Sequence, residues 1–162
     1  MGAGKSSVGA ALARELGFPF VELDTRIETR EGRAISRIFQ ESGEPVFRKI
    51  EHHALRDFLS ENHFASHILA LGGGAFVQPE NAKLIQEKAC VTIFLDAPPE
   101  ELFQRCSAQN SGRPLQKDFD DFRNLYEARR ARYLAATLRI ETNGKTVEAV
   151  VAEVACGLGL RN

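Results

Sequence analysis

The chain begins with a run of glycine, lysine and serine that restricts the possible folds more than any other stretch. Residues 1–7 read Met-Gly-Ala-Gly-Lys-Ser-Ser, and Gly4, Lys5 and Ser6 fill the last three fixed positions of the phosphate-binding pattern GxxxxGK[ST]. Apolar residues recur with helical spacing over residues 8–16. We therefore expect a phosphate-binding loop that leads directly into a helix, rather than a glycine-rich tail.

In such a loop, backbone N–H groups and the N-terminus of the helix bind phosphate oxygens. The residues predicted to contact the phosphates of ATP are Gly2, Ala3, Gly4, Lys5, Ser6 and Ser7. The pattern places Lys5 at the β- and γ-phosphates and the hydroxyl of Ser6 on Mg²⁺.

The loop pattern is incomplete at its start, because its first glycine would lie two residues before Met1. A strand also precedes a loop of this kind, and none stands before it here. We expect the two loop residues and this strand, about 7–10 residues, upstream of Met1. A chain without them is expected to have an exposed apolar groove beside the loop, weak ATP binding and low stability.

Segments with strand and helix character alternate from the loop to the end of the chain. The predicted strands are residues 18–23, 67–71, 91–96 and 138–141, and helical segments lie between them. No repeat or linker divides the 162 residues, a length that suits one domain. The alternation predicts an α/β fold with a mainly parallel sheet.

The charge and the cysteine content argue against several classes of protein. The 21 basic and 22 acidic residues give a net charge of −1 without a basic block, which argues against binding nucleic acid or a membrane surface. No apolar run reaches the ~18 residues of a membrane span, and no signal sequence is evident, so a cytoplasmic location is expected. The three cysteines are far apart and predict neither a disulfide framework nor a zinc site.

Motifs spread over nearly the whole chain resemble those of the shikimate kinase family in order and spacing. They are Phe20-Val21-Glu22-Leu23-Asp24, Gly43-Glu44, Phe47-Arg48 with Glu51, Gly72-Gly73-Gly74, Arg113-Pro114-Leu115, and Arg129 four residues before Tyr133. The resemblance implies a P-loop NTPase-like three-layer α/β/α fold with a mainly parallel five-stranded sheet, its first strand absent or truncated in this chain. It also implies a single domain, 1–162, with a flexible lid at about 107–118, expected to act as a monomer.

The activity that this resemblance implies is ATP-dependent phosphorylation of a hydroxyl group of shikimate, giving shikimate 3-phosphate and ADP with the help of Mg²⁺. Asp24 matches the aspartate that binds the ring hydroxyls and accepts the proton of the attacking one. Arg48 and Arg129 match the two arginines that hold the substrate carboxylate. Arginine suits this task because its planar guanidinium can make a bidentate pair with a carboxylate.

Further residues are carried over in the same way. Gly72, Gly73 and Gly74 match the run whose backbone approaches the substrate ring, and Arg113 matches the lid arginine above the nucleotide phosphates. Lys5, Asp24 and Arg113 are the catalytic residues that the resemblance implies. Residues matching those that shape or brace the substrate pocket are Phe39, Phe47 and Glu51.

The chain departs from the family near the expected metal, where Glu22 replaces the usual aspartate. Ser6 is the predicted magnesium ligand, and Glu22 is predicted to act on the ion indirectly.

Plainer interpretations of the individual residues stay open. Asp24 is also suited to capping the N-terminus of a helix, Arg48 to pairing with acidic neighbours on a solvated helix face, and Arg129 to a surface charge. Two other functions also remain: another small-molecule kinase, acting on gluconate or a nucleoside monophosphate, and a kinase-like module that binds its ligands without turnover.

Overall fold

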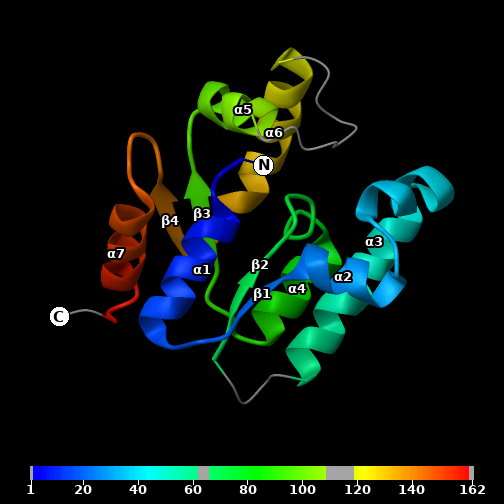
Figure 1. Cartoon of the computed structure of the whole chain (residues 1–162), viewed down its shortest axis with the longest axis horizontal. Coiled ribbons are helices and arrows are strands. Elements are labelled where there is room, and N and C mark those ends of the chain that lie inside the picture. The colour runs from blue at the N-terminus through cyan, green and yellow to red at the C-terminus, as the bar shows by residue number, and fades with distance from the viewer. Residues whose placement is uncertain (1, 62–65, 109–118, 161–162) are drawn as a thin grey trace.

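Helices and strands alternate over most of the chain, as predicted (Figure 1). The computed structural model describes residues 2–61, 66–108 and 119–160. In chain order, the elements of this part are α1 (Lys5–Leu16), β1 (Phe20–Glu22), α2 (Leu23–Glu31), α3 (Ile35–Glu61), β2 (Ile68–Ala70), α4 (Pro79–Glu87), β3 (Ile93–Asp96), α5 (Pro99–Ala108), α6 (Phe119–Tyr133), β4 (Leu138–Glu141) and α7 (Val147–Gly157). None of these helices is both long and apolar enough to cross a membrane.

The four predicted strands form two parallel pairs. Strand β1 pairs with β2, Val21 lying opposite Leu69, and β3 pairs with β4, Leu95 lying opposite Ile140. No ladder joins the two pairs within the described part of the chain. Among the described residues there is no fifth strand. Because both pairs are parallel, the α/β class with parallel strands is confirmed.

Helices cover both faces of β2, because neighbouring side chains of a strand point to opposite sides. Ile68 packs against a cluster from α1, α5, α6, α7 and the β3–β4 pair, whereas Leu69 packs against a second cluster from α2, α3 and α4. In Figure 1, α1 and α7 accordingly lie beside β3 and β4, and α2, α3 and α4 lie on the other side of β1 and β2. The predicted three-layer arrangement of helices around strands follows from these two clusters.

The boundary between β1 and α2 differs from the prediction. Residues 18–23 were expected as one strand, but β1 ends at Glu22 and Leu23 is the first residue of α2. Leu23 and Ile27 lie one helical turn apart and are both fully buried in the second cluster. This tertiary burial outweighs the strand propensity of the preceding residues.

Helix α3 contains a break at Gly43 that divides it into two helical segments. Gly43 has φ 78° and ψ 168°, a conformation that a residue with a side chain rarely adopts. Pro45 is tolerated inside the element because it follows this break, where its missing N–H group leaves no helical hydrogen bond unmade. The second half of α3 therefore takes its own direction, and it carries Arg48.

Candidate active site

The predicted phosphate loop forms a tight turn against α5. Gly2 has φ 61°, and a Cβ atom there would lie 2.6 Å from the carbonyl oxygen of Leu102 and 2.9 Å from Sγ of Cys106. Gly4, with φ 78°, directly precedes Lys5, the first residue of α1. The first turn of α1 holds no acidic residue, so the positive end of the helix dipole is not offset by its own side chains. This arrangement suits an anionic ligand such as a phosphate group.

Ser6 and Glu22, the residues predicted near magnesium, meet at the start of α1. The hydroxyl of Ser6 donates a hydrogen bond to Oε1 of Glu22, and the hydroxyl of Thr25 donates one of 3.4 Å to Oε2. A serine hydroxyl that donates its proton keeps its lone pairs, and hydroxyl and carboxylate oxygens are hard ligands that suit Mg²⁺. The donor set therefore fits this ion. No group of three or more His, Cys, Asp or Glu side chains suited to a metal occurs among the described residues.

Asp24 lies against the glycine run that follows β2. A Cβ atom on Gly72 would lie 2.7 Å from Oδ1 of Asp24 and 3.3 Å from Oε1 of Glu51. Only a residue without a side chain lets both carboxylates come this close to the backbone. Asp24 is not the N-cap of α2, because Glu22 occupies that position and makes no capping hydrogen bond with its side chain. The capping interpretation of Asp24 is therefore wrong.

Arg48 reaches the same glycine run from α3. Its Nε and Nη2 donate to Oε1 of Glu44 at 3.1 and 2.8 Å, and Nη1 donates to Oε2 of Glu51 at 2.9 Å. A Cβ atom on Gly74 would lie only 2.4 Å from Nη1 of Arg48. The side chain of Arg48 is 16% exposed. Arg48 thus makes the helix pairs of the plainer interpretation, but on a largely buried face that contacts Gly74.

Glu51 is a buried carboxylate between Arg48 and Asp24. Its side chain is 1% exposed, and this burial raises the pKa of Glu51 above its ordinary value. The hydrogen bond and charge of Arg48 act in the opposite direction, whereas the neighbouring charge of Asp24 raises the pKa further. The ionised form of Glu51 therefore depends on Arg48.

Helix α6 brings Arg129 and Tyr133 to the same region. The hydroxyl of Tyr133 donates a hydrogen bond to the carbonyl oxygen of Gly73. Burial raises the pKa of Tyr133, and the charge of Arg129 opposes this shift. Arg129 also lowers the pKa of Glu51 electrostatically, so it lies close to the group that holds Arg48. The bond from Tyr133 to Gly73 was missed by sequence reasoning, although Tyr133 lies one helical turn after Arg129.

The aromatic residues expected to shape the pocket lie together. The rings of Phe39 and Phe47 have centroids 4.6 Å apart, and the guanidinium of Arg48 stacks over Phe47 with 5.2 Å between its carbon and the ring centroid.

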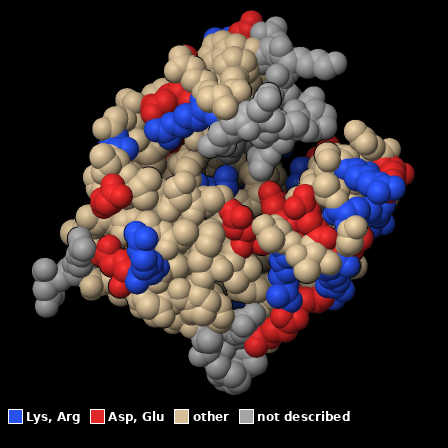
Figure 2. All heavy atoms as spheres, viewed as in Figure 1, with Lys and Arg blue, Asp and Glu red and all other residues tan. Residues whose placement is uncertain are grey.

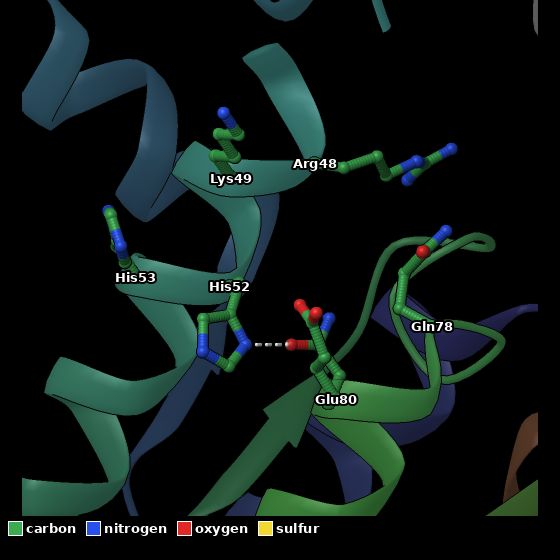
Figure 3. Close-up of a pocket in the computed structure, with 7 residues that line it drawn as sticks. Arg48, Lys49, His52, His53, Gln78 and Glu80 are labelled. Atoms are coloured by element: carbon green, nitrogen blue, oxygen red, sulfur yellow. Dashed lines mark hydrogen bonds between the residues drawn. The ribbon is translucent and has the colours of Figure 1, made fainter. Parts of the chain in front are cut away.

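A pocket of about 280 Å³ lies between α3 and the start of α4 (Figure 3). It is lined by Arg48, Lys49, His52, His53, Gln78, Glu80 and Asn81. Arg48 is the only predicted site residue among them, and in Figure 3 it extends from α3 toward the side of the loop that precedes α4. In Figure 2 the surface is hollowed between the α1 side and the α3 side of the molecule, and charged side chains of both signs border the hollow.

Arg113, and the predicted lid from residue 109 onward, lie outside the described residues. Residues 107 and 108 belong to the end of α5.

The chain is similar to shikimate kinases over nearly its whole length. Residues 1–157 match the family described as shikimate kinase. A shikimate kinase of Caulobacter vibrioides (strain NA1000 / CB15N) is 45% identical over 156 residues, which are 94% of this chain and 75% of that protein. The structure of a shikimate kinase from Acinetobacter baumannii in complex with shikimate has a TM-score of 0.89 and 31% identity, covering 99% of this chain and 90% of that one.

A gluconokinase from Sinorhizobium meliloti 1021 is less similar, with 21% identity and a TM-score of 0.64, covering 99% of this chain and 87% of that chain. That likeness shows a shared fold alone. The family match over residues 1–157, together with 45% identity to a relative of which this chain covers 75%, shows that the chain belongs to the shikimate kinase family.

Proposed function

We propose that this protein transfers the γ-phosphoryl group of ATP to a hydroxyl group of shikimate, giving shikimate 3-phosphate and ADP. Membership of the shikimate kinase family supports this activity. The observation that carries it is the approach of Asp24 and Arg48 to Gly72 and Gly74, because it joins a carboxylate and a guanidinium at one stretch of backbone. A hydroxylated carboxylic acid such as shikimate requires this combination of groups.

In the proposed reaction, Asp24 accepts the proton of the attacking hydroxyl. The hydroxyl oxygen forms a bond to the γ-phosphorus, the bond from this phosphorus to the oxygen bridging it to the β-phosphate breaks, and ADP leaves with that electron pair. The protein contributes mainly by holding the two reactants in line and by neutralising charge. Asp24 acts from the first turn of α2, beside Gly72.

Arg48 and Arg129 are proposed to bind the carboxylate of the substrate. The three hydrogen bonds that Arg48 makes to Glu44 and Glu51 use one N–H of each nitrogen. A guanidinium has five N–H groups, so one N–H on Nη1 and one on Nη2 are not used by these bonds. The acidic partners thus orient the guanidinium while leaving it able to donate to a ligand.

The nucleotide is proposed to bind with its phosphates at Gly2, Ala3, Gly4, Lys5, Ser6 and Ser7. Lys5 neutralises the β- and γ-phosphates, and Arg113 is proposed to do so from the predicted lid. Ser6, with Glu22 beside it, would hold Mg²⁺, which when bound neutralises phosphate charge. The expected monomeric state and cytoplasmic location stay predictions.

An assay of ADP release tests this proposal and its rivals together. Shikimate is expected to stimulate ADP release from ATP, and gluconate and nucleoside monophosphates are not. Phosphorus NMR of the product should show a phosphomonoester on the 3-hydroxyl. A protein that binds shikimate in calorimetry but releases no ADP would support the binding-module alternative, and stimulation by gluconate alone would support the other kinase.

A further inference from the structure

Both helices that carry a predicted substrate-binding arginine also carry, four residues later, a side chain that is linked by hydrogen bonds to the loop at 72–75, directly for Tyr133 and through Asn81 for His52. On α3, His52 follows Arg48, and on α6, Tyr133 follows Arg129. Residues four apart lie on the same face of a helix. Helix α6 therefore contacts the loop through Tyr133, and α3 supports through His52 the Asn81 side chain that bonds to Ala75.

Tyr133 holds the loop from the α6 side. Its hydroxyl donates to the carbonyl oxygen of Gly73, and its ring packs against Phe94 with 5.2 Å between centroids. Burial raises the pKa of Tyr133, so the phenol stays protonated and able to donate. A trans peptide is planar, so a Gly73 carbonyl that points to Tyr133 directs the N–H of Gly74 to the opposite side. One hydrogen bond thus sets the orientation of a whole peptide group.

Asn81 holds the loop from the α4 side. This residue is fully buried, and its Nδ2 donates to the carbonyl oxygen of Ala75 at 3.0 Å. Its Oδ1 lies 2.8 Å from Nδ1 of His52, the bond drawn dashed in Figure 3. Since the amide nitrogen of Asn81 is the donor to Ala75, Oδ1 accepts and Nδ1 of His52 carries the proton. The N–H of Ala75 in turn donates to the carbonyl of Gly72 at 3.1 Å and closes the turn.

The loop needs such support because side chains of its own would block the site. A Cβ atom on Gly72 or Gly74 would lie within 2.7 Å of Asp24 or Arg48. Glycine also loses more backbone entropy than other residues when it is ordered. Hydrogen bonds to the backbone carbonyls therefore replace the side-chain packing that the three glycines cannot have, whereas Ala75 packs into the second cluster.

We propose that Tyr133 and Asn81 are positioning residues for the substrate, which hold the backbone of Gly73 and Ala75 in register with Arg48 and Arg129. This inference rests on the proposed function, because it concerns binding of shikimate at that site. Neither residue is required to touch the substrate. Each acts through the orientation of the peptide groups in the loop.

The two tyrosines of the chain provide a matched test, because both lie on α6 and both donate a hydrogen bond through the hydroxyl. Tyr133→Phe removes the bond to Gly73 but keeps the ring, whereas Tyr126→Phe removes a bond to the buried carboxylate of Asp96. Tyr133→Phe is expected to raise KM for shikimate about fivefold, the loss of one net hydrogen bond, with kcat and KM for ATP changed by less than about twofold. Tyr126→Phe is expected to lower Tm and leave KM for shikimate unchanged.

Amide exchange measured by NMR without any ligand gives a second readout. In Tyr133→Phe the amide of Ala75 is expected to exchange about tenfold faster than in Tyr126→Phe, because the turn opens more easily without the hydrogen bond from Tyr133 to Gly73. Asn81→Ser removes the hydrogen bond from Asn81 to the carbonyl of Ala75 and is likewise expected to raise KM for shikimate. It provides a second variant if Tyr133→Phe does not fold.

The outcomes separate this inference from the proposed function. A wild-type protein without shikimate-dependent ADP release overturns the function, and the exchange measurement then still reports whether Tyr133 holds the loop. An active Tyr133→Phe enzyme with unchanged KM for shikimate, or unchanged exchange at Ala75, overturns the inference.

Discussion

Replacing Arg48 by alanine is expected to destabilise the fold chiefly through the carboxylate that it leaves behind. Glu51 is 1% exposed, and Nη1 of Arg48 lies 2.9 Å from its Oε2. Removing one partner of a buried ion pair costs about 3–5 kcal/mol, and since Arg48 itself is 16% exposed we expect a value near the lower end, about 3 kcal/mol. In a chain of this size 1 kcal/mol corresponds to about 2–4 °C in Tm, so the expected loss is about 6–12 °C.

The stability lost in Arg48→Ala should increase as the pH rises. A carboxyl group whose pKa is higher in the folded than in the unfolded protein stabilises the fold while it is protonated, and this contribution is lost as the pH rises through the folded pKa. Burial already raises the pKa of Glu51, and removal of Arg48 removes the main opposing influence. The Arg48→Ala substitution should therefore cost least near the unfolded pKa of glutamate, about 4.3, and most at pH 8.

Urea denaturation followed by circular dichroism at pH 5 and pH 8 measures both effects. The double variant Arg48→Ala/Glu51→Gln is expected to regain much of the loss, because a neutral amide is less costly to bury than an unpaired carboxylate. Arg37→Ala is a control on the same helix, since Arg37 is 68% exposed and pairs with Glu41 at the surface. Equal losses at both pH values, or a double variant no more stable than Arg48→Ala, would refute the reasoning.

Three further substitutions test the proposed site. Asp24→Asn is expected to abolish ADP release while ATP affinity in calorimetry changes little, because an amide cannot accept the hydroxyl proton; a wild-type rate would contradict the assignment. Gly74→Ala places a Cβ atom 2.4 Å from Nη1 of Arg48 and should raise KM for shikimate about tenfold or more, whereas Gly157→Ala, which meets only the flexible side chain of Leu138 at 2.8 Å, should affect stability alone. Glu22→Gln is expected to raise the Mg²⁺ concentration for half-maximal activity about tenfold, and an unchanged requirement would remove Glu22 from the metal site.

Much of the fold was predictable because it depends on residues close together in the sequence. The glycine-rich loop before Lys5, the helix after it and the four strands follow from local composition and periodicity, and the helix and strands are present in the structure. The boundary between β1 and α2 was predicted wrongly, since residue 23 was expected in the strand and lies in the helix. Its position depends on Leu23, which is buried against residues of α3 that no local pattern reveals.

The candidate site was predictable as a set of residues but not as an arrangement. The resemblance of the ordered motifs to those of shikimate kinases singled out Asp24, Arg48 and the glycine run. The sequence could not show that Glu51 is the buried partner of Arg48, or that Tyr133 bonds to Gly73. The pairing of Arg48 with Glu51 is local to α3, but its burial requires that helix to pack against its neighbours. The bond from Tyr133 joins α6 with a loop sixty positions away, so it also exists only in the packed chain.

The amino-acid sequence by itself thus determined the α/β class, the phosphate loop and the family to which the chain belongs, because these depend on local patterns and on the order of motifs. Only the tertiary structure decided which charged side chains are buried and which of them pair with one another. Whether Arg48 is a solvated surface residue or a largely buried one depends on the approach of Gly74 and on the burial of Glu51. Burial and long-range hydrogen bonds are properties of the packed chain, since water is excluded only where distant segments meet.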